Sequence, residues 1–242
     1  MLKRRDSPAD LYAVRVRATT PLAKAGTVAL HLAPGVVAYL LLHLARRPLS
    51  DALGLSENSV QLVVMTGIML LLAVGALLGP IALHGLSAAD TVDFLGLRRL
   101  DLTGLVLAAA LAAVLLILPT DQWYADSASA SLQRIEWLDL DAWHFQRSDA
   151  FLAVPGWLAG TALLCNLVGE ELWFRGYLQP KLSFLGRWTW VAGGILFTAY
   201  HVFEAPLVYP NPLGGLALAG LYALRRDLWS CVVLHALLQA PV

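Results

Sequence analysis

The chain has 242 residues, of which 58% are hydrophobic, and its 17 basic residues balance its 17 acidic residues. With glycine included, the apolar share is about two-thirds, well above the roughly 45 to 50% of soluble domains. This composition excludes an ordinary soluble protein, and the lack of net positive charge argues against a nucleic-acid partner. We therefore expect an all-α, polytopic helix bundle embedded in a lipid bilayer.

About seven membrane spans are predicted, because a bilayer core of about 30 Å needs roughly 20 apolar residues per helix. The first three apolar stretches are clear, whereas the last four are shorter or are interrupted by charges, Gly and Pro. The first span should remain as an anchor, because the basic residues before it are followed by a polar stretch. In chain order the predicted spans are 25–45, 60–83, 103–119, 151–179, 188–205, 212–224 and 228–242.

The chain divides at its longest predicted external loop, 120–150, which is rich in Asp and aromatic residues. Aromatic side chains of this kind sit at the level of the lipid headgroups, so an interfacial helix is predicted at 131–146, either as an anchored loop or as a cap that gates substrate entry. Residues 1–149 then form N-terminal spans with an external loop. Residues 150–242 form a second helical part, which carries most of the polar groups inside spans.

The positions of Lys and Arg predict the orientation. Thirteen of them fall on the side of the N-terminus, and four, Arg46, Arg47, Arg134 and Arg147, fall on the other side. The N-terminus is therefore predicted to be cytoplasmic and the C-terminus external.

A pair of acidic residues followed by a basic residue marks the fourth span. Glu171 and Arg175 are four residues apart with the acid first, the better order for an ion pair on one helix face. Glu170 points about 100° away from Glu171 and has Asn166 one turn before it on its own side. Ionisable groups inside a span are expensive and suggest function. Arg175 is expected to neutralise one carboxylate and leave the other for chemistry.

Two further pairs with a spacing of four residues follow in the last spans. Phe197 precedes His201, and His235 precedes Gln239 on one face of the final helix. Counted along the helices, Glu170, His201 and His235 fall in one layer of the cytoplasmic half of the membrane. Each pair alone is a weak signal, because a histidine in a membrane helix is often a simple hydrogen-bonding residue.

Together these motifs resemble the CPBP family of intramembrane endopeptidases, also described as the CAAX protease and bacteriocin-protection (Abi) family. The resemblance rests on Glu170-Glu171-x-x-x-Arg175, Phe197-x-x-x-His201 and His235-x-x-x-Gln239, in this order on successive helices. It covers about residues 150–242, the family's catalytic helical core. One position departs from the family pattern, since Gln239 stands where the family has Asn.

The resemblance implies a glutamic endopeptidase that cleaves a membrane-associated protein or peptide. It assigns the general base to Glu170 and the positioning of the attacking water to His201. His235 and Gln239 match the pair that donates to the developing oxyanion, a role that a side-chain amide suits. Glu171, Arg175 and Phe197 are then supporting residues. The expected location is a bacterial inner membrane.

No cofactor is expected, but a zinc-dependent version of the same protease stays open. Glu170, His201 and His235 would be its three ligands, with water in the fourth place. The sequence gives no independent metal motif such as HExxH. Two other classes of function also stay open: a non-catalytic relative that regulates a membrane partner, with Gln239 as the hint, and a small transporter with a proton relay.

Other notable residues have simpler interpretations. The two cysteines, Cys165 and Cys231, are expected to be small core residues. Gly193-Gly194 and Gly214-Gly215 are expected to permit close helix packing or to add backbone flexibility. Interhelical hydrogen bonding or placement at the interface is expected for the histidines of the first spans, His31, His43 and His84.

Overall fold

The computed structural model describes residues 16–98, 100–117, 127, 154–204 and 212–239. Every regular element in these ranges is a helix, and no strand occurs in them. The predicted all-α membrane bundle is thus confirmed. The interfacial helix predicted at 131–146 lies outside the described residues.

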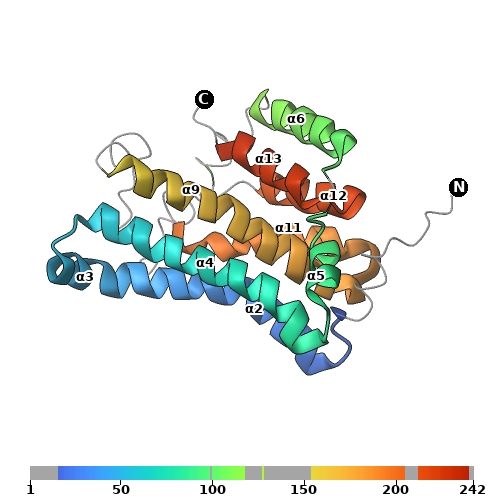
Figure 1. Cartoon of the computed structure of the whole chain (residues 1–242), viewed down its shortest axis with the longest axis horizontal. Helices are drawn as coiled ribbons and strands as arrows, with labels where there is room; N and C mark the ends of the chain where they lie inside the picture. The colour runs from blue at the N-terminus through green and yellow to red at the C-terminus, as the bar shows by residue number, and fades with distance from the viewer. Residues whose placement is uncertain (1–15, 99, 118–126, 128–153, 205–211, 240–242) are drawn as a thin grey trace, which may run out of the picture.

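A helix occupies each of the seven predicted spans (Figure 1). By length and composition, the continuous helices Pro21–Leu53 and Glu57–His84 are each able to cross a membrane, whereas Leu102–Ile117 and Leu228–Gln239 are apolar but shorter. The helices are α2 (Pro21–Leu40), η1 (Leu41–Ala45), α3 (Arg46–Leu53), α4 (Glu57–His84), α5 (Ala88–Phe94), α6 (Leu102–Ile117), α9 (Gly156–Glu170), η3 (Glu171–Leu178), α10 (Gln179–Lys181), η4 (Leu182–Trp188), α11 (Thr189–Tyr200), η5 (His201–Glu204), α12 (Pro212–Arg225) and α13 (Leu228–Gln239).

Local sequence signals set several helix ends. Ser87 and Asp90 form a reciprocal capping box at the start of α5, in which the Asp90 amide donates to Ser87 Oγ over 3.1 Å. Gly85 ends α4 in the left-handed region, at a φ of 65°, where glycine has no Cβ penalty. These signals place α4 and α5 on either side of a sharp turn.

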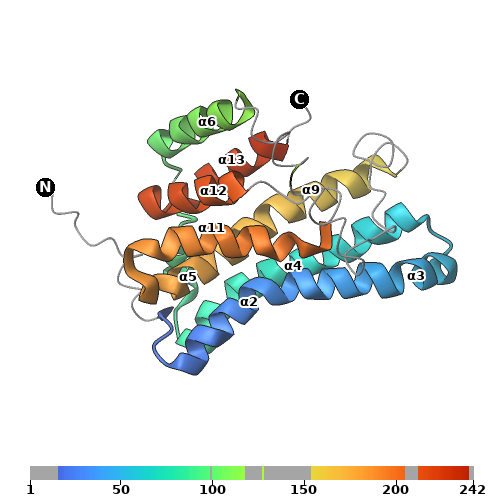
Figure 2. The ribbon, with the colours of Figure 1, turned by 180° about the vertical axis from the view of Figure 1, so that it is seen from behind.

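Close packing joins α9 to α4 and α11 to α12, and in both views α9 and α11 run between α4 and α12 (Figures 1 and 2). A Cβ on Gly169 would meet the backbone oxygen of Met69 in α4 at 2.6 Å, and one on Gly215 would meet that of Gly194 at 2.8 Å. Gly194 and Gly215 therefore permit close packing, as predicted. Their neighbours Gly193 and Gly214 have only ordinary contacts, at 3.5 and 3.7 Å.

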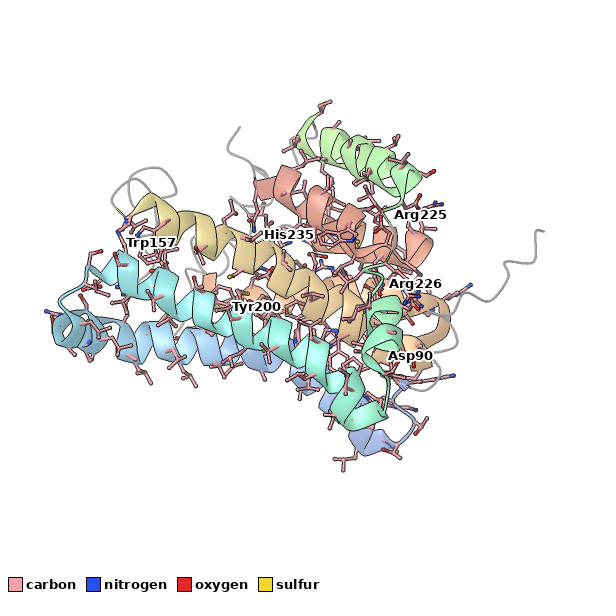
Figure 3. The ribbon with its side chains drawn as sticks, in the orientation of Figure 1. Asp90, Trp157, Tyr200, Arg225, Arg226 and His235 are labelled. Carbon is pink, nitrogen blue, oxygen red and sulfur yellow. The ribbon has the colours of Figure 1, made fainter. Side chains whose placement is uncertain are left out.

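The helix connections predicted to be cytoplasmic meet at one end of the bundle. Asp101 before α6 pairs with Arg225 at the end of α12, and the amide of Leu228 donates to the carbonyl of Gly96 over 3.2 Å. Figure 3 places Arg225, Arg226 and Asp90 at this end and Trp157 at the other.

Two more contacts join the remaining connections of this group. The Lys181 ammonium lies 3.0 Å from His84 Nε2 at the end of α4, and the amide of Ala18 donates to the carbonyl of Lys181 over 3.4 Å. Arg46, predicted to lie on the opposite side, pairs instead with Glu57 at the α3–α4 connection, over 2.8 Å. The basic connections therefore share a side as predicted, while the orientation in the cell stays a prediction.

We predict that reporter fusions after Arg99, Gln146 and Val242 will report inside, outside and outside. The excess of basic residues at the N-terminal side should hold those connections in the cytoplasm. Paired alkaline phosphatase and fluorescent reporters at each site provide the measurement. An inside signal at Gln146 would contradict the topology.

Candidate active site

The two adjacent carboxylates lie where the fourth span changes its winding. Glu170 is the last residue of α9, and Glu171 is the first residue of η3, an eight-residue π-helical segment. The sequence predicts a continuous span here and carries no signal for the wider winding. π-Helical insertions are often found at functional sites. Glu170, Glu171 and Arg175 are 1%, 0% and 1% exposed, so all three are ionisable groups inside the bundle.

Glu171 is held by two cationic or hydrogen-bonding partners. Its Oε1 lies 3.2 Å from Arg175 NH1, as the spacing of four predicted, and 2.9 Å from Nδ1 of His235. The guanidinium of Arg175 also covers the Phe197 ring, with its Cζ 3.7 Å from the ring centroid. Phe197 therefore supports the cation of the ion pair. Glu171 is the neutralised member of the carboxylate pair.

Glu170 has a different environment, because the hydrogen-bond donors that it contacts are neutral side chains. Oε1 accepts hydrogen bonds from Asn166 Nδ2 and from the Tyr200 hydroxyl, each over 3.2 Å. Oε2 has no hydrogen-bond partner among the described residues, and it lies 3.8 Å from His235 Nε2. One oxygen is thus fixed by two donors, and the other is available to a ligand.

The backbone of α11 orients His201. Its Nδ1 lies 2.8 Å from the carbonyl oxygen of Phe197, and a carbonyl can only accept, so Nδ1 carries the proton. In the neutral ring, Nε2 is then the acceptor. The imidazole packs edge-on against the rings of Phe197 and Tyr200, with both centroid distances at 4.7 Å. His201 therefore joins the layer of polar groups through aromatic packing.

Gln239 reaches into the same cluster from the end of α13. Its Nε2 lies 3.0 Å from His235 Nε2 and 3.0 Å from Asn166 Oδ1. The stacking of His235 and Gln239 on one helix face was predicted, but the contact between Gln239 and α9 was not. Figure 3 shows His235 and Tyr200 in the middle of the bundle, between its two ends.

Two members of this cluster, Asn166 and Tyr200, were not predicted from the sequence. Asn166 was placed beside Glu170, but the sequence gave no sign that it also contacts the last helix. Tyr200 was missed completely, because a buried Tyr next to His201 looks like an ordinary packing residue. The available signal was a Tyr within an apolar span, since its hydroxyl needs a hydrogen-bond partner there.

The other histidines have structural roles. His31 is fully buried and bonds through Nδ1 to the carbonyl of Thr27, 2.8 Å away within its own helix, rather than between helices as expected. His84 makes the expected interhelical contact with Lys181. His43 stacks on Tyr39, with ring centroids 5.7 Å apart.

The cysteines have the expected core placement, and neither forms a disulfide. Cys231 is fully buried, and Cys165 packs at the edge of the core.

The zinc alternative would require a rearrangement at His235. Among the described residues, no group of three His, Cys, Asp or Glu side chains is arranged to hold a metal ion. Nδ1 of His235 already faces the Glu171 carboxylate, and its Nε2 faces the Gln239 amide. His235 would have to leave one of these partners to bind zinc.

Residues 152–240 match the family model described as type II CAAX prenyl endopeptidase Rce1-like. The matched segment contains every residue of the cluster, and it confirms the resemblance found in the sequence. Neither the curated proteins nor the solved structures include a match to this chain. The match indicates a membrane peptidase that acts on a protein or a peptide.

Removal of the Arg175 charge should destabilise the bundle strongly. Arg175→Met leaves the Glu171 carboxylate buried without its cation, which should cost about 3 to 5 kcal/mol of unfolding free energy. The double variant Glu171→Gln, Arg175→Met should recover much of this loss, because a neutral amide oxygen still accepts from His235. Thermal unfolding in detergent measures both variants. Equal losses for the single and double variants would show that the ion pair is not the source.

Proposed function

We propose that this protein is an intramembrane endopeptidase in which Glu170 activates a water molecule to attack a peptide bond. The observation that carries the proposal is that Glu170 contacts only neutral donors, on Oε1, whereas Glu171, whose Oε2 likewise has no hydrogen-bond partner among the described residues, is paired with the Arg175 cation. Two donors fix Oε1, whereas Oε2 has no hydrogen-bond partner among the described residues. A general base needs one basic atom within hydrogen-bond reach of the proton that it removes. Oε2 meets this need.

The environments of the two carboxylates support different roles for them. Arg175 and His235 both contact Glu171, so its charge is compensated within the protein. Glu170 has only neutral donors on Oε1. When two neighbouring acidic groups have such different surroundings, one of them commonly reacts and the other supports it. We assign the reaction to Glu170 and the support to Glu171.

His201 is proposed to orient the attacking water. The Phe197 carbonyl holds its Nδ1 proton, so Nε2 is left as a hydrogen-bond acceptor. An acceptor and a carboxylate oxygen can each take one hydrogen of a water and turn its oxygen toward the substrate carbonyl. The backbone contact fixes the tautomer that this role requires.

Gln239 and His235 are proposed to stabilise the oxyanion. The two amide hydrogens of Gln239 face His235 Nε2 and Asn166 Oδ1 in the resting site. A hydrogen bond to a negatively charged oxygen is roughly twice as strong as a neutral one. The developing oxyanion should therefore draw one of these hydrogens away from the imidazole. His235 would donate directly only as an imidazolium, whose charge the Glu171 carboxylate would balance.

The reaction then needs no group beyond these side chains. The water oxygen bonds to the substrate carbonyl carbon as its proton passes to Glu170 Oε2, and the carbonyl oxygen becomes an oxyanion. The protonated Glu170 next gives its proton to the amide nitrogen, the C–N bond breaks, and the oxyanion returns to a carbonyl. The products are a carboxylic acid and an amine.

The depth of the site supports a substrate at the membrane. The cluster lies in the middle of the bundle, away from its charged end (Figure 3). A membrane-anchored protein or peptide would meet it without leaving the bilayer. The family description names a CAAX prenyl endopeptidase, so prenylated C-terminal peptides are the first probes, beside unprenylated membrane-anchored peptides. We propose a bacterial inner membrane with a cytoplasmic N-terminus as its location.

Glu170→Gln should abolish cleavage, because the amide keeps the shape of the side chain but cannot accept the water proton. We expect a loss of at least about 10²-fold in kcat with unchanged expression. Purified protein in liposomes with a fluorogenic membrane-anchored peptide provides the measurement. Asp93→Asn is the matched control, because it neutralises a carboxylate that pairs with the exposed Arg98, outside the cluster, and should leave the rate unchanged. Wild-type cleavage by Glu170→Gln would refute the general-base role.

Chelation distinguishes the glutamic mechanism from the zinc alternative. We expect activity to survive dialysis against a strong chelator, because no proposed step uses a metal. The same liposome assay before and after dialysis measures this. Activity that is lost and then restored by zinc would establish metal chemistry instead.

A further inference from the structure

We propose that Asn166 is a positioning residue of this site, whose side-chain amide links Gln239 to Glu170 and fixes the direction of the hydrogen bonds between the two carboxylates. The proposal rests on the function proposed above. Asn166 belongs to none of the sequence motifs that define the candidate site. It lies one helical turn before Glu170 on α9, so its amide faces both the general base and the end of α13.

The contacts form a continuous chain across three helical segments. Asn166 Nδ2 donates to Glu170 Oε1 over 3.2 Å, and Gln239 Nε2 donates to Asn166 Oδ1 over 3.0 Å. The same Gln239 nitrogen contacts His235 Nε2 at 3.0 Å, and His235 Nδ1 contacts Glu171 Oε1 at 2.9 Å. The two carboxylates, adjacent in sequence, are thus also connected through space by two amides and an imidazole.

The polarity of this chain follows from its two ends. An ionised Glu170 only accepts, so the Asn166 NH₂ must face it and the Asn166 oxygen must face Gln239. The Gln239 NH₂ must then face both Asn166 and the imidazole, so His235 Nε2 must accept. The remaining ring proton is on Nδ1, where the Glu171 carboxylate accepts it. Each bond in the chain agrees with its neighbours, and a reversed Asn166 amide would set oxygen against oxygen at Glu170.

Asn166 therefore does two things for the proposed reaction. It helps to hold Glu170 Oε1, which leaves Oε2 for the water, and it holds one hydrogen of Gln239 so that the other is directed for the oxyanion. The longer side chain of Gln239 fits this role, because an Asn at this position would be one methylene too short for the same contact. Gln239, which stands where the family has Asn, thus has a matching partner in Asn166 on α9.

The first test is Asn166→Leu, which has a similar shape but no hydrogen bonds. We expect kcat to fall by about 10- to 100-fold with a small change in KM, because the lost contacts act on the base and the oxyanion donor. Loss of a donor to the ionised base should also move the acidic limb of the kcat/KM profile to higher pH. Among the described residues, the charged and titratable groups that act on Glu170 are Glu171, Arg175, Tyr200 and His235, and this substitution changes none of them.

Exchanging the side-chain lengths at positions 166 and 239 tests whether the hydrogen bond between Asn166 and Gln239 (the bridge), rather than packing, supports the rate. Gln239→Asn should lose activity because its amide cannot reach Asn166. The double variant Asn166→Gln, Gln239→Asn keeps the total length of the two side chains and should recover at least half of the lost rate. Thr91→Val is the control, since it removes one side-chain hydrogen bond to the Ser87 carbonyl on α5, at the charged end of the bundle where Figure 3 shows Asp90. Its rate should stay within about twofold of wild type.

A measurement that does not depend on activity can test the bridge even if the proposed function is wrong. In ¹⁵N-histidine-labelled protein, His235 Nε2 should resonate as an unprotonated, hydrogen-bonded nitrogen, and Asn166→Leu should shift it toward a free nitrogen. This result would support the bridge even if no peptide is cleaved. If Asn166→Leu leaves both the acidic limb and the His235 resonance unchanged, the bridge is overturned, whether or not the rate falls.

Discussion

Two carboxylates buried side by side in an apolar bundle are the constraint on which the rest of this structure depends. An isolated ionised carboxylate away from water is very costly, so each must find charge or hydrogen-bond partners inside the protein. Glu171 takes Arg175 and His235, while Glu170 takes Asn166 and Tyr200. These partners come from η3, α13, α9 and α11. The polar cluster can therefore form only when these four segments pack together.

Small residues let the helices approach closely enough to bring these partners together. A Cβ on Gly35 of α2 would overlap the carbonyl oxygen of Tyr200, so α2 lies directly against the residue that donates to Glu170. Gly169 allows the α4 backbone to approach one residue before Glu170. In a membrane, where lipid tails are as apolar as the helices, such close contacts are a main source of association between helices. The same contacts set the position of the proposed base.

The sequence predicted the class of fold and the main partners because these depend on local patterns. Apolar length located the spans, and a spacing of four residues predicted the ion pair of Glu171 with Arg175. The sequence could not predict the π-helical winding of η3 or the contact of Gln239 with Asn166. The first is a small change of backbone geometry without a sequence signature, and the second joins residues 73 positions apart in the chain. Tyr200 was missed because its hydroxyl partner lies on another helix.

An experimental structure with a bound peptide ketone would test the central claim most directly. Such a ketone binds as its hydrate and mimics the tetrahedral intermediate. We predict one hydrate oxygen at about 2.5 to 2.7 Å from Glu170 Oε2, the range of a charge-assisted hydrogen bond, and the other within about 3.1 Å of the Gln239 amide. A hydrate bound to a metal ion, or one that contacts Glu171 and leaves Glu170 unengaged, would contradict the account.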